Sequence, residues 1–390
     1  MKEQIKFFLG TSSLFILLFC FNKVQADDLM NAVVQGNYDG AKTLLEESRV
    51  NNHPLDPLLF KCAVDNQDYR LVALLMSYGL CDTKLLEGAS RPFLHNIREL
   101  YQRLPEPGFC DQRLSELGAG YVEELSKNGI VRISGLVSAS DLASMQKDFQ
   151  KFVDSMDDQR ARGINVENRR DEYYCPETNV YHSNNPFALS TTLVDVCCSS
   201  EVCSIINTYL GKVGYITKGW ATHYMPGGKD VNFFTWHHDK SGSRLKMMIL
   251  LGDVEERSRH LSYVLGSHEI SHAYETYGCG QSGIDYYEKL TGKAPVVFKA
   301  LGKAGDIFLF DPNGIHKANC GEVTRDTFII TYSPDKHLIF KVTLPYQFFD
   351  NKVVDESHPF FRVLAAQSRK YFMPAYGGWL GSLDHVDAWY

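Results

Sequence analysis

The chain has 390 residues and a mass of 44.2 kDa, of which 44% are hydrophobic and 12% aromatic. This composition is typical of a globular protein with a sizeable core. Its formal net charge is -7 and it has no long basic run, so we expect no nucleic-acid partner, because phosphate binding needs a clustered cationic surface.

The first 26 residues have the pattern of a secretory signal peptide. Lys2 and Lys6 flank a short positive start, Phe7–Phe21 is almost wholly apolar, and Ala26 offers a small residue for cleavage before an acidic pair. A membrane anchor over residues 7–21 is the alternative, but this run of fifteen residues is shorter than the roughly 20 that a spanning helix needs. We therefore predict export, with no stable membrane span in the mature chain.

The cysteines indicate neither a disulfide framework nor a zinc ribbon. Removal of Cys20 with the leader leaves nine of the ten, with no CxxC pair and no regular spacing. Cys197, Cys198 and Cys203 are close enough in sequence to pair in an oxidising compartment, and buried free thiols are the other interpretation.

Two segments near the start of the mature chain repeat at a spacing of 31 residues: AVVQGNYDGAKTLLEE (32–47) and AVDNQDYRLVALLMSYG (63–79). Ala32 matches Ala63, and Ala41 matches Val72. Each segment resembles a degenerate ankyrin repeat, with two short helices divided by a polar turn. A stack needs about three repeats, so residues 84–104 are expected to form a third helix pair or a cap. An ordinary helical domain is the alternative for residues 27–105.

A linker is predicted at LPEPGF (104–109), because two prolines and a glycine interrupt the helical pattern. The next segment predicts a helix, a strand over Ile130–Ile133 and a second helix that begins at Ser138 or Ser140. The polar, aperiodic stretch Asp157–Tyr174 predicts a loop.

From residue 213 onward the sequence contains eight short alternating or apolar runs, separated by Gly, Asp and Pro. They are GYITKGWATHYM, VNFFTW, RLKMMILLGDV, LSYVLG, PVVFKALG, DIFLFD, TFIITYS and IFKVTL. Strands at this pitch indicate a sandwich or barrel. The chain is therefore predicted to be an α+β multidomain protein, with an N-terminal helical unit followed by a β domain over residues 110–390.

The stretch WHHDKSG (236–242) contains a candidate metal site. Residues i and i+2 of a strand share a face, so His237 and Asp239 lie together and His238 points away. One imidazole and one carboxylate, completed by a distant histidine, form the facial triad that binds ferrous iron and leaves open positions for chemistry. A second H-x-D at His385 and Asp387 has nothing downstream to supply a third ligand, and we interpret it as coincidental.

For the first H-x-D, the sequence downstream does contain a candidate third ligand. His316 follows a strand and a turn, and Arg325 opens the next predicted strand, on which Thr327, Ile329 and Thr331 would share its face. An arginine inside a barrel is costly unless it meets a carboxylate, which its planar fork binds in bidentate fashion. An acidic cosubstrate is therefore expected.

The run 236–269, followed by 305–325, resembles the core of the phytanoyl-CoA dioxygenase family of Fe(II)/2-oxoglutarate oxygenases. With the preceding GYITKGW and GIVRISGLVSASDL, the resemblance extends over Leu114–Pro334. Four features follow the family's order: H-x-D after a tryptophan, a strand ending in Asp253-Val254, a Gly-Ser-His turn, and a distal histidine with arginine nine residues later.

By position, the resemblance implies that His237, Asp239 and His316 bind Fe(II) and that Arg325 binds the 5-carboxylate of 2-oxoglutarate. It also implies a double-stranded β-helix, a jelly roll with helices packed outside, and hydroxylation coupled to decarboxylation of 2-oxoglutarate to succinate. Related halogenases lack the carboxylate ligand, so the presence of Asp239 favours hydroxylation.

Three further residues near this core have weaker signals. Lys246 interrupts an apolar strand; if it points inward it would join the arginine at the cosubstrate carboxylate, and a lysine extending from the strand edge to water is the alternative. Asn319 is a candidate for a hydrogen bond to a metal ligand. His268 is expected to be structural.

Two departures from the family concern loops near the cleft rather than the metal ligands. Ser258-Arg259-His260 stands where an Asn-Gly-Pro-like turn is usual, and Leu265 stands where a proline is common. These changes affect the expected substrate, not the expected iron.

The sequence therefore predicts an Fe(II)/2-oxoglutarate-dependent dioxygenase that acts on a small molecule, a lipid or a protein, with a protein partner expected to bind the helical repeats. The alternative is a catalytically silent jelly-roll scaffold that binds a protein. A cupin-like protein using Zn or Mn would explain the ligands but gives Arg325 no role. Acyl-CoA is not the expected substrate, because the leader predicts a compartment outside the cytosol.

Overall fold

The structure is a computed structural model that describes residues 26–50, 55–87, 89–109, 111, 113–167, 172–227, 235–239, 243–270 and 281–334. The predicted signal peptide, the second H-x-D and the predicted strand IFKVTL lie outside the described residues, as does most of VNFFTW. The chain divides into two compact units, with the main boundary after residue 110.

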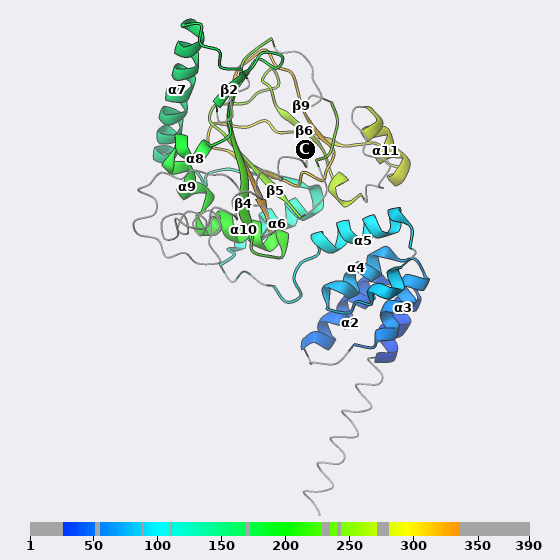
Figure 1. Cartoon of the computed structure of the whole chain (residues 1–390). Coiled ribbons are helices and arrows are strands. Elements are labelled where there is room, and N and C mark those ends of the chain that lie inside the picture. Colours follow the sequence, from blue (N-terminus) through cyan, green and yellow to red (C-terminus); the bar gives the residue numbers. More distant parts are fainter. Residues whose placement is uncertain are drawn as a thin grey trace, which may run out of the picture. The chain divides into compact units, whose positions relative to one another are not determined.

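The first unit is helical. It contains a helix over 26–34, α2 (Tyr38–Val50), α3 (Pro57–Asp65), α4 (Tyr69–Ser77), the short 3-10 helix η1 (Thr83–Leu86) and α5 (Arg91–Arg103), shown from blue to cyan in Figure 1. These elements surround one apolar core that includes Leu45, Phe60 and Leu75.

The 31-residue repeat of the sequence is also a repeat of backbone structure. Gly36 N donates to Val33 O, and 31 residues later Gln67 N donates to Val64 O. Gly36 and Gln67 both have positive φ, of 69° and 52°, so the same left-handed turn ends the first helix of each pair. The structure therefore confirms two equivalent helix pairs in the predicted register.

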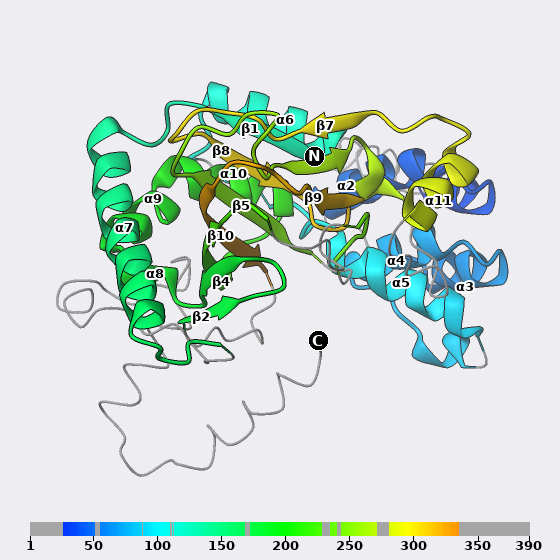
Figure 2. The ribbon, with the colours of Figure 1, turned by 90° about the horizontal axis from the view of Figure 1, so that it is seen from above.

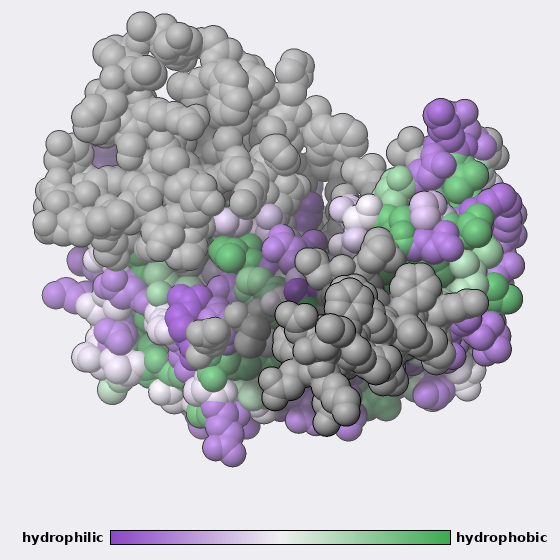
Figure 3. Space-filling view, turned by 90° about the horizontal axis from the view of Figure 1, so that it is seen from below, coloured by the Kyte–Doolittle hydropathy of each residue, from purple (hydrophilic) through white to green (hydrophobic). Residues whose placement is uncertain are grey.

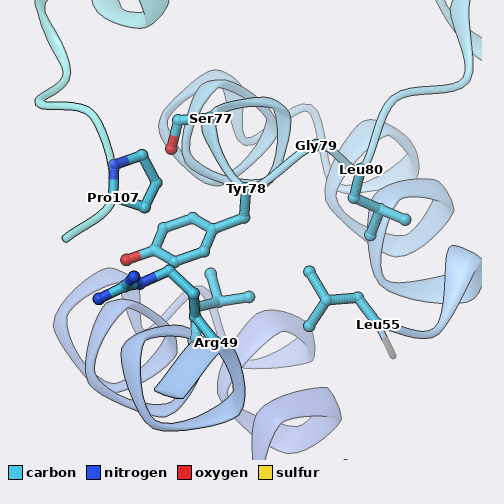
Figure 4. A pocket seen from close by; sticks show the side chains of 8 residues that line it. Arg49, Leu55, Ser77, Tyr78, Gly79, Leu80 and Pro107 are labelled. Atoms are coloured by element: carbon cyan, nitrogen blue, oxygen red, sulfur yellow. The ribbon is translucent and has the colours of Figure 1, made fainter. Parts of the chain in front are cut away.

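The segment after the second pair packs on the same core through Ile97 of α5. The predicted linker also contacts this unit, since Pro107 lines a cavity of about 500 Å³ with Arg49 and Tyr78 (Figure 4). Gly108 has a φ of +74°, and a Cβ there would lie 2.4 Å from the Arg49 guanidinium. The Arg49 side chain is flexible and could move, so it is the positive φ that favours glycine where the chain leaves the helices.

The second unit begins with helices and then forms two sheets. Its helices are α6 (Glu116–Asn128), α7 (Ala139–Ala161), α8 (Pro186–Leu189), α9 (Thr191–Cys197), α10 (Ser200–Leu210), the 3-10 helix η3 (Ser267–Glu269) and α11 (Gln281–Thr291). Its strands are β1 (Ile130–Ile133), β2 (Glu172–Cys175), β3 (Val180–Ser183), β4 (Tyr215–Tyr224), β5 (Leu245–Leu250), β6 (Leu261–Val264), β7 (Val297–Lys299), β8 (Ile307–Phe310), β9 (His316–Ala318) and β10 (Arg325–Ser333).

All strand pairs between these elements are antiparallel. The large sheet has the order β1-β8-β5-β10-β4-β3-β2, and the small sheet has the order β7-β6-β9. Helices α7 to α10 lie on the side of the large sheet that is opposite β6 and β9 (Figures 1 and 2). Two antiparallel sheets, with successive strands crossing between them and helices outside, agree with the predicted jelly-roll core.

Alternation along β10 separates the two faces of the large sheet. Phe328, Ile330 and Tyr332 belong to the apolar cluster that the outer helices cover. The side chains between them face the small sheet, where a second apolar cluster includes Met248 and Phe310. The predicted inward set on β10 therefore points to the interior between the sheets.

The loop predicted over Asp157–Tyr174 is wrong at both ends. Helix α7 continues to Ala161, and β2 begins at Glu172. The helix continues without an apolar period because its polar end is held by long-range contacts: Arg160 donates a 2.7 Å hydrogen bond to the Tyr181 hydroxyl and stacks 4.0 Å from the Tyr174 ring centroid.

Cys197 and Cys203 are buried and form no disulfide bond. The interpretation as buried thiols therefore holds for Cys197 and Cys203, and burial raises the pKa of the Cys203 thiol to about 11. Such thiols react slowly.

Among the described helices, none is long and apolar enough by itself to cross a bilayer; only the bent pair α9 and α10 passes by length and composition together. Residues of both helices belong to the buried core. On the face in Figure 3, hydrophilic and hydrophobic residues alternate in small patches over the coloured area.

Candidate metal centre

The small sheet brings the H-x-D segment against the distal histidine. His237 N donates to His316 O at 2.9 Å and His316 N donates to His237 O at 2.7 Å, so the two residues form an antiparallel bridge. Asp239 N donates to Pro312 O at 2.9 Å. Backbone pairing thus brings together His316 and the H-x-D pair, although Asp239 and His316 are 77 positions apart in the sequence (316 − 239).

Three side chains converge at this bridge. The Nε2 atoms of His237 and His316 lie 3.9 and 3.8 Å from Asp239 Oδ1, and one ligand atom from each residue lies within 4.8 Å of the others. His238 is not in the cluster, as strand alternation predicts. It is buried, and its ring Nδ1 lies 2.7 Å from its neighbour's carbonyl oxygen.

Hydrogen bonds to backbone carbonyls set the tautomer of both imidazoles. His237 Nδ1 lies 2.8 Å from Thr235 O, and His316 Nδ1 lies 2.8 Å from Gly314 O. Because a carbonyl oxygen only accepts, each Nδ1 carries the proton and each Nε2 directs its lone pair toward Asp239. This arrangement is typical of metal-binding histidines.

The charges of the cluster suit a divalent cation. Burial lowers the pKa of His316 to about 3, so its imidazole is neutral near pH 7. Burial raises the pKa of Asp239, but the Lys246 ammonium and the two histidines overcome this effect and hold the pKa well below its usual range. Two imidazoles and one carboxylate are the donor set of ferrous facial-triad sites, and the residues present fit Fe(II).

Lys246 points inward, from the central strand β5. Its Nζ lies 2.5 Å from Asp239 Oδ2 and 5.5 Å from the Trp220 ring centroid. The alternative of a lysine extending from a strand edge is wrong, because β5 lies between β8 and β10.

Arg325, the first residue of β10, is 4% exposed and its guanidinium carbon lies 4.4 Å from the Tyr224 ring centroid. Burial lowers its pKa, an effect that Tyr224 opposes. Its Nε has no hydrogen-bond partner, and no salt bridge joins it to a carboxylate within the described ranges. A buried guanidinium of this kind is suited to a carboxylate ligand.

The remaining candidates have structural contacts. Asn319 Nδ2 donates to His260 O and Ser262 Oγ of the neighbouring strand, at 3.0 and 2.6 Å, so these bonds support β6 rather than a metal ligand. His268 Nε2 lies 3.0 Å from Ser126 O, which agrees with its expected structural role.

The sequence interpretation did not identify Tyr224 as a neighbour of Arg325, nor His182 and Arg259 as neighbours of Tyr224. Tyr224 stands beside Arg325 in the β4–β10 register, His182 stacks on Tyr173 with ring centroids 5.0 Å apart, and Arg259 is 1% exposed. Of these three residues, only Arg259 had a signal in the sequence, because it departs from the turn that is usual in the family.

The profile of the phytanoyl-CoA dioxygenase (PhyH) family matches residues 125–321, which is half of the chain and contains the three clustered residues. A search of curated protein sequences finds no significant match.

Three of the solved structures that match this chain illustrate the comparison. EctD from S. alaskensis with bound Fe matches 57% of this chain and 78% of its own at 19% identity and a TM-score of 0.45. SnoK, a non-heme alpha ketoglutarate dependent carbocyclase from nogalamycin biosynthesis, matches 58% and 87% at 15% identity and 0.42. HygX from Streptomyces hygroscopicus, with nickel, 2-oxoglutarate and hygromycin B, matches 56% and 87% at 12% identity and 0.39.

Because all three TM-scores lie below 0.5, the assignment rests on the family profile. The class that this profile and the His-Asp-His cluster define is the non-heme Fe(II)/2-oxoglutarate-dependent oxygenases. The chain belongs to the phytanoyl-CoA dioxygenase family, and its cofactors are Fe(II) and 2-oxoglutarate.

Proposed function

We propose that the protein hydroxylates a C–H bond of its substrate, with Fe(II) held by His237, Asp239 and His316 and the 5-carboxylate of 2-oxoglutarate bound by Arg325. The observation that carries the proposal is the convergence of one ligand atom from each of the three residues within 4.8 Å. When bound, the iron supplies the chemistry in which dioxygen and 2-oxoglutarate yield succinate, carbon dioxide and one hydroxyl group on the substrate.

The chain's own contribution is binding and orientation. The carbonyl oxygens of Thr235 and Gly314 hold the imidazole protons on Nδ1, so the Nε2 atoms remain available as ligands without loss of a proton. The low pKa of Asp239 keeps its carboxylate charged. When bound, Fe(II) held by these three ligands would keep positions open for 2-oxoglutarate and dioxygen.

The walls of the site are suited to excluding water. Met248 and Phe310 are buried on the interior face, and the Phe310 ring centroid lies 5.6 Å from that of His316. A dry, preorganised site strengthens each charge interaction within it. The presence of the Asp239 carboxylate favours hydroxylation over halogenation, since related halogenases lack that ligand.

Anaerobic addition of Fe(II) and 2-oxoglutarate to residues 27–390 tests the proposal, with the visible metal-to-ligand charge-transfer band as readout. We expect the wild-type band to be abolished by His316→Ala, and Arg325→Ala to raise the 2-oxoglutarate concentration needed for half-saturation by roughly 10- to 100-fold, the equivalent of a lost charged hydrogen bond. His385→Ala, in the second H-x-D, is the matched control and should retain the band.

Absence of a band in folded wild-type protein would contradict the proposal and favour the silent scaffold. With a band established, succinate release in the presence of candidate small molecules, lipids and peptides identifies the substrate class.

For the helical unit we propose an ankyrin-like repeat stack that binds a protein partner. The equivalent helix pairs and the cavity in Figure 4 support this role, because stacked repeats present continuous binding surfaces. We further propose that residues 1–26 direct export, a role that N-terminal sequencing of the secreted protein would test.

A further inference from the structure

Arg259 is the largest fully buried side chain of the described residues, although it occupies a turn where the family usually has small or rigid residues. Its Nη1 donates a 2.9 Å hydrogen bond to Thr178 O. Its guanidinium carbon lies 5.7 Å from the ring centroid of Tyr224, the same ring that Arg325 approaches at 4.4 Å. The two guanidinium groups therefore lie near the same half-buried aromatic ring.

Backbone contacts place the Arg259 turn directly beside the segment that leads into β10. Ser258 bridges Val323 in parallel, and Glu322 N donates to Arg257 O at 2.8 Å. A Cβ at Gly321 would lie 2.3 Å from Arg259 N, so the absence of a side chain there permits this approach. The position of Arg259 relative to Arg325 is thus fixed by main-chain packing.

Two guanidinium groups near one ring repel each other, and an anion bound between them would relieve that repulsion. Burial is the main cause that lowers the pKa of Arg325, and the charge of Arg259 adds to it. An anion bound at Tyr224 would reverse both effects. Guanidinium groups are well suited to bind a carboxylate, through planar pairs of N–H donors.

We propose that Arg259 and Arg325 form a single anion pocket, and that Arg259 is a second guanidinium for the 5-carboxylate of 2-oxoglutarate, selecting a 2-oxo dicarboxylate over a 2-oxo monocarboxylate. The inference rests on the proposed function, since it assumes that 2-oxoglutarate binds with its distal carboxylate at Arg325.

The test compares 2-oxoglutarate with 2-oxovalerate, which has the same chain length but no distal carboxylate. Dissociation constants are measured anaerobically from the charge-transfer band of the Fe(II)-loaded protein. Arg259→Gln removes the charge and retains an N–H donor for Thr178 O. We expect it to weaken 2-oxoglutarate roughly 10- to 100-fold, the size of a lost charged hydrogen bond, and to leave 2-oxovalerate within about twofold of wild type. Arg259→Lys, which keeps the charge, should recover part of the affinity.

Equal changes for both ligands, or no change for either, would overturn the inference and make Arg259 a structural residue. If Arg259→Gln does not fold, Arg325→Gln supplies the answer, because Arg259 then remains as the second guanidinium. That variant should keep a reduced preference for 2-oxoglutarate, and a complete loss of preference would count against the pocket. Failure of the wild type to bind Fe(II) and 2-oxoglutarate would refute the proposed function itself, which is a distinguishable result.

Discussion

The two faces of the large sheet differ in chemistry although they share the same strands. On β10, the face toward the helices contains Phe328, Ile330 and Tyr332, all buried in one apolar cluster. The opposite face of that strand contains Arg325 and Thr327. The helix side is expected to provide most of the stability, because it removes large apolar side chains from water.

The interior face combines apolar walls with charged side chains that are half-buried or, at Arg325, buried, and such charges are costly without partners. Lys246 pairs with Asp239 at 2.5 Å, and Thr222 and Thr327 share a 2.7 Å hydrogen bond between their hydroxyls. The contrast between the two faces indicates that alternate residues of the same strands serve different purposes: one set stabilises the fold and the other binds ligands. Mutations on one face should therefore affect one property far more than the other.

The largest effect is expected from Phe328→Ala on the helix side. Phe328 is fully buried and its ring meets Phe149 edge to face, with centroids 5.5 Å apart. Loss of the ring should lower the free energy of unfolding by about 3–5 kcal/mol through lost burial and a cavity. Denaturant titration gives this value, and the folded protein should bind 2-oxoglutarate with wild-type affinity. A tenfold loss of that affinity would contradict the view that residues on the helix side affect folding and not ligand binding.

A smaller effect, on ligands rather than folding, is expected from Lys246→Met on the interior face. Removal of a cation beside Asp239 should strengthen Fe(II) binding by about tenfold and weaken 2-oxoglutarate by about tenfold, since the first is a cation and the second a dianion. Anaerobic calorimetry measures both.

The matched control for Lys246 is Lys218→Met. Thr331 of β10 pairs with Lys246 on β5 and with Lys218 on β4, and Lys218 Nζ lies 5.7 Å from the Trp220 ring centroid. The Lys218→Met variant should change Fe(II) affinity less than Lys246→Met does. If Lys246→Met left the affinity for 2-oxoglutarate unchanged, the role of Lys246 would be limited to balancing the charge of Asp239.

A third effect concerns the pH dependence of stability. Burial lowers the pKa of His182 from 6.5 to about 4, so between these values the unfolded chain binds more protons than the folded one. The contribution of His182 to the free energy of unfolding is complete above pH 6.5 and declines as the pH falls toward 4. From pH 7 to 5, wild type should lose about 2 kcal/mol more than His182→Phe. Parallel denaturation curves for the two proteins at pH 7 and 5 would show that His182 is not held neutral.

Several features of this protein follow from local sequence. Alternation along TFIITYS predicts which side chains of β10 face the interior, because successive residues of a strand point to opposite sides. The 31-residue spacing predicts the equivalence of Ala32 and Ala63, both buried, because each repeat forms the same helix pair. The H-x-D spacing places His237 and Asp239 on one side. Each inference uses residues only a few positions apart, or one motif that occurs twice.

Tertiary structure decided what depends on pairing between distant segments. Pairing of His237 with His316 completes the metal cluster, and pairing of β4 with β10 brings Tyr224 to Arg325. Arg259 becomes a site residue only because its turn lies against the chain that enters β10. Side-chain alternation determines the direction of each residue, whereas its neighbours depend on strand order and register, which no short stretch of sequence specifies.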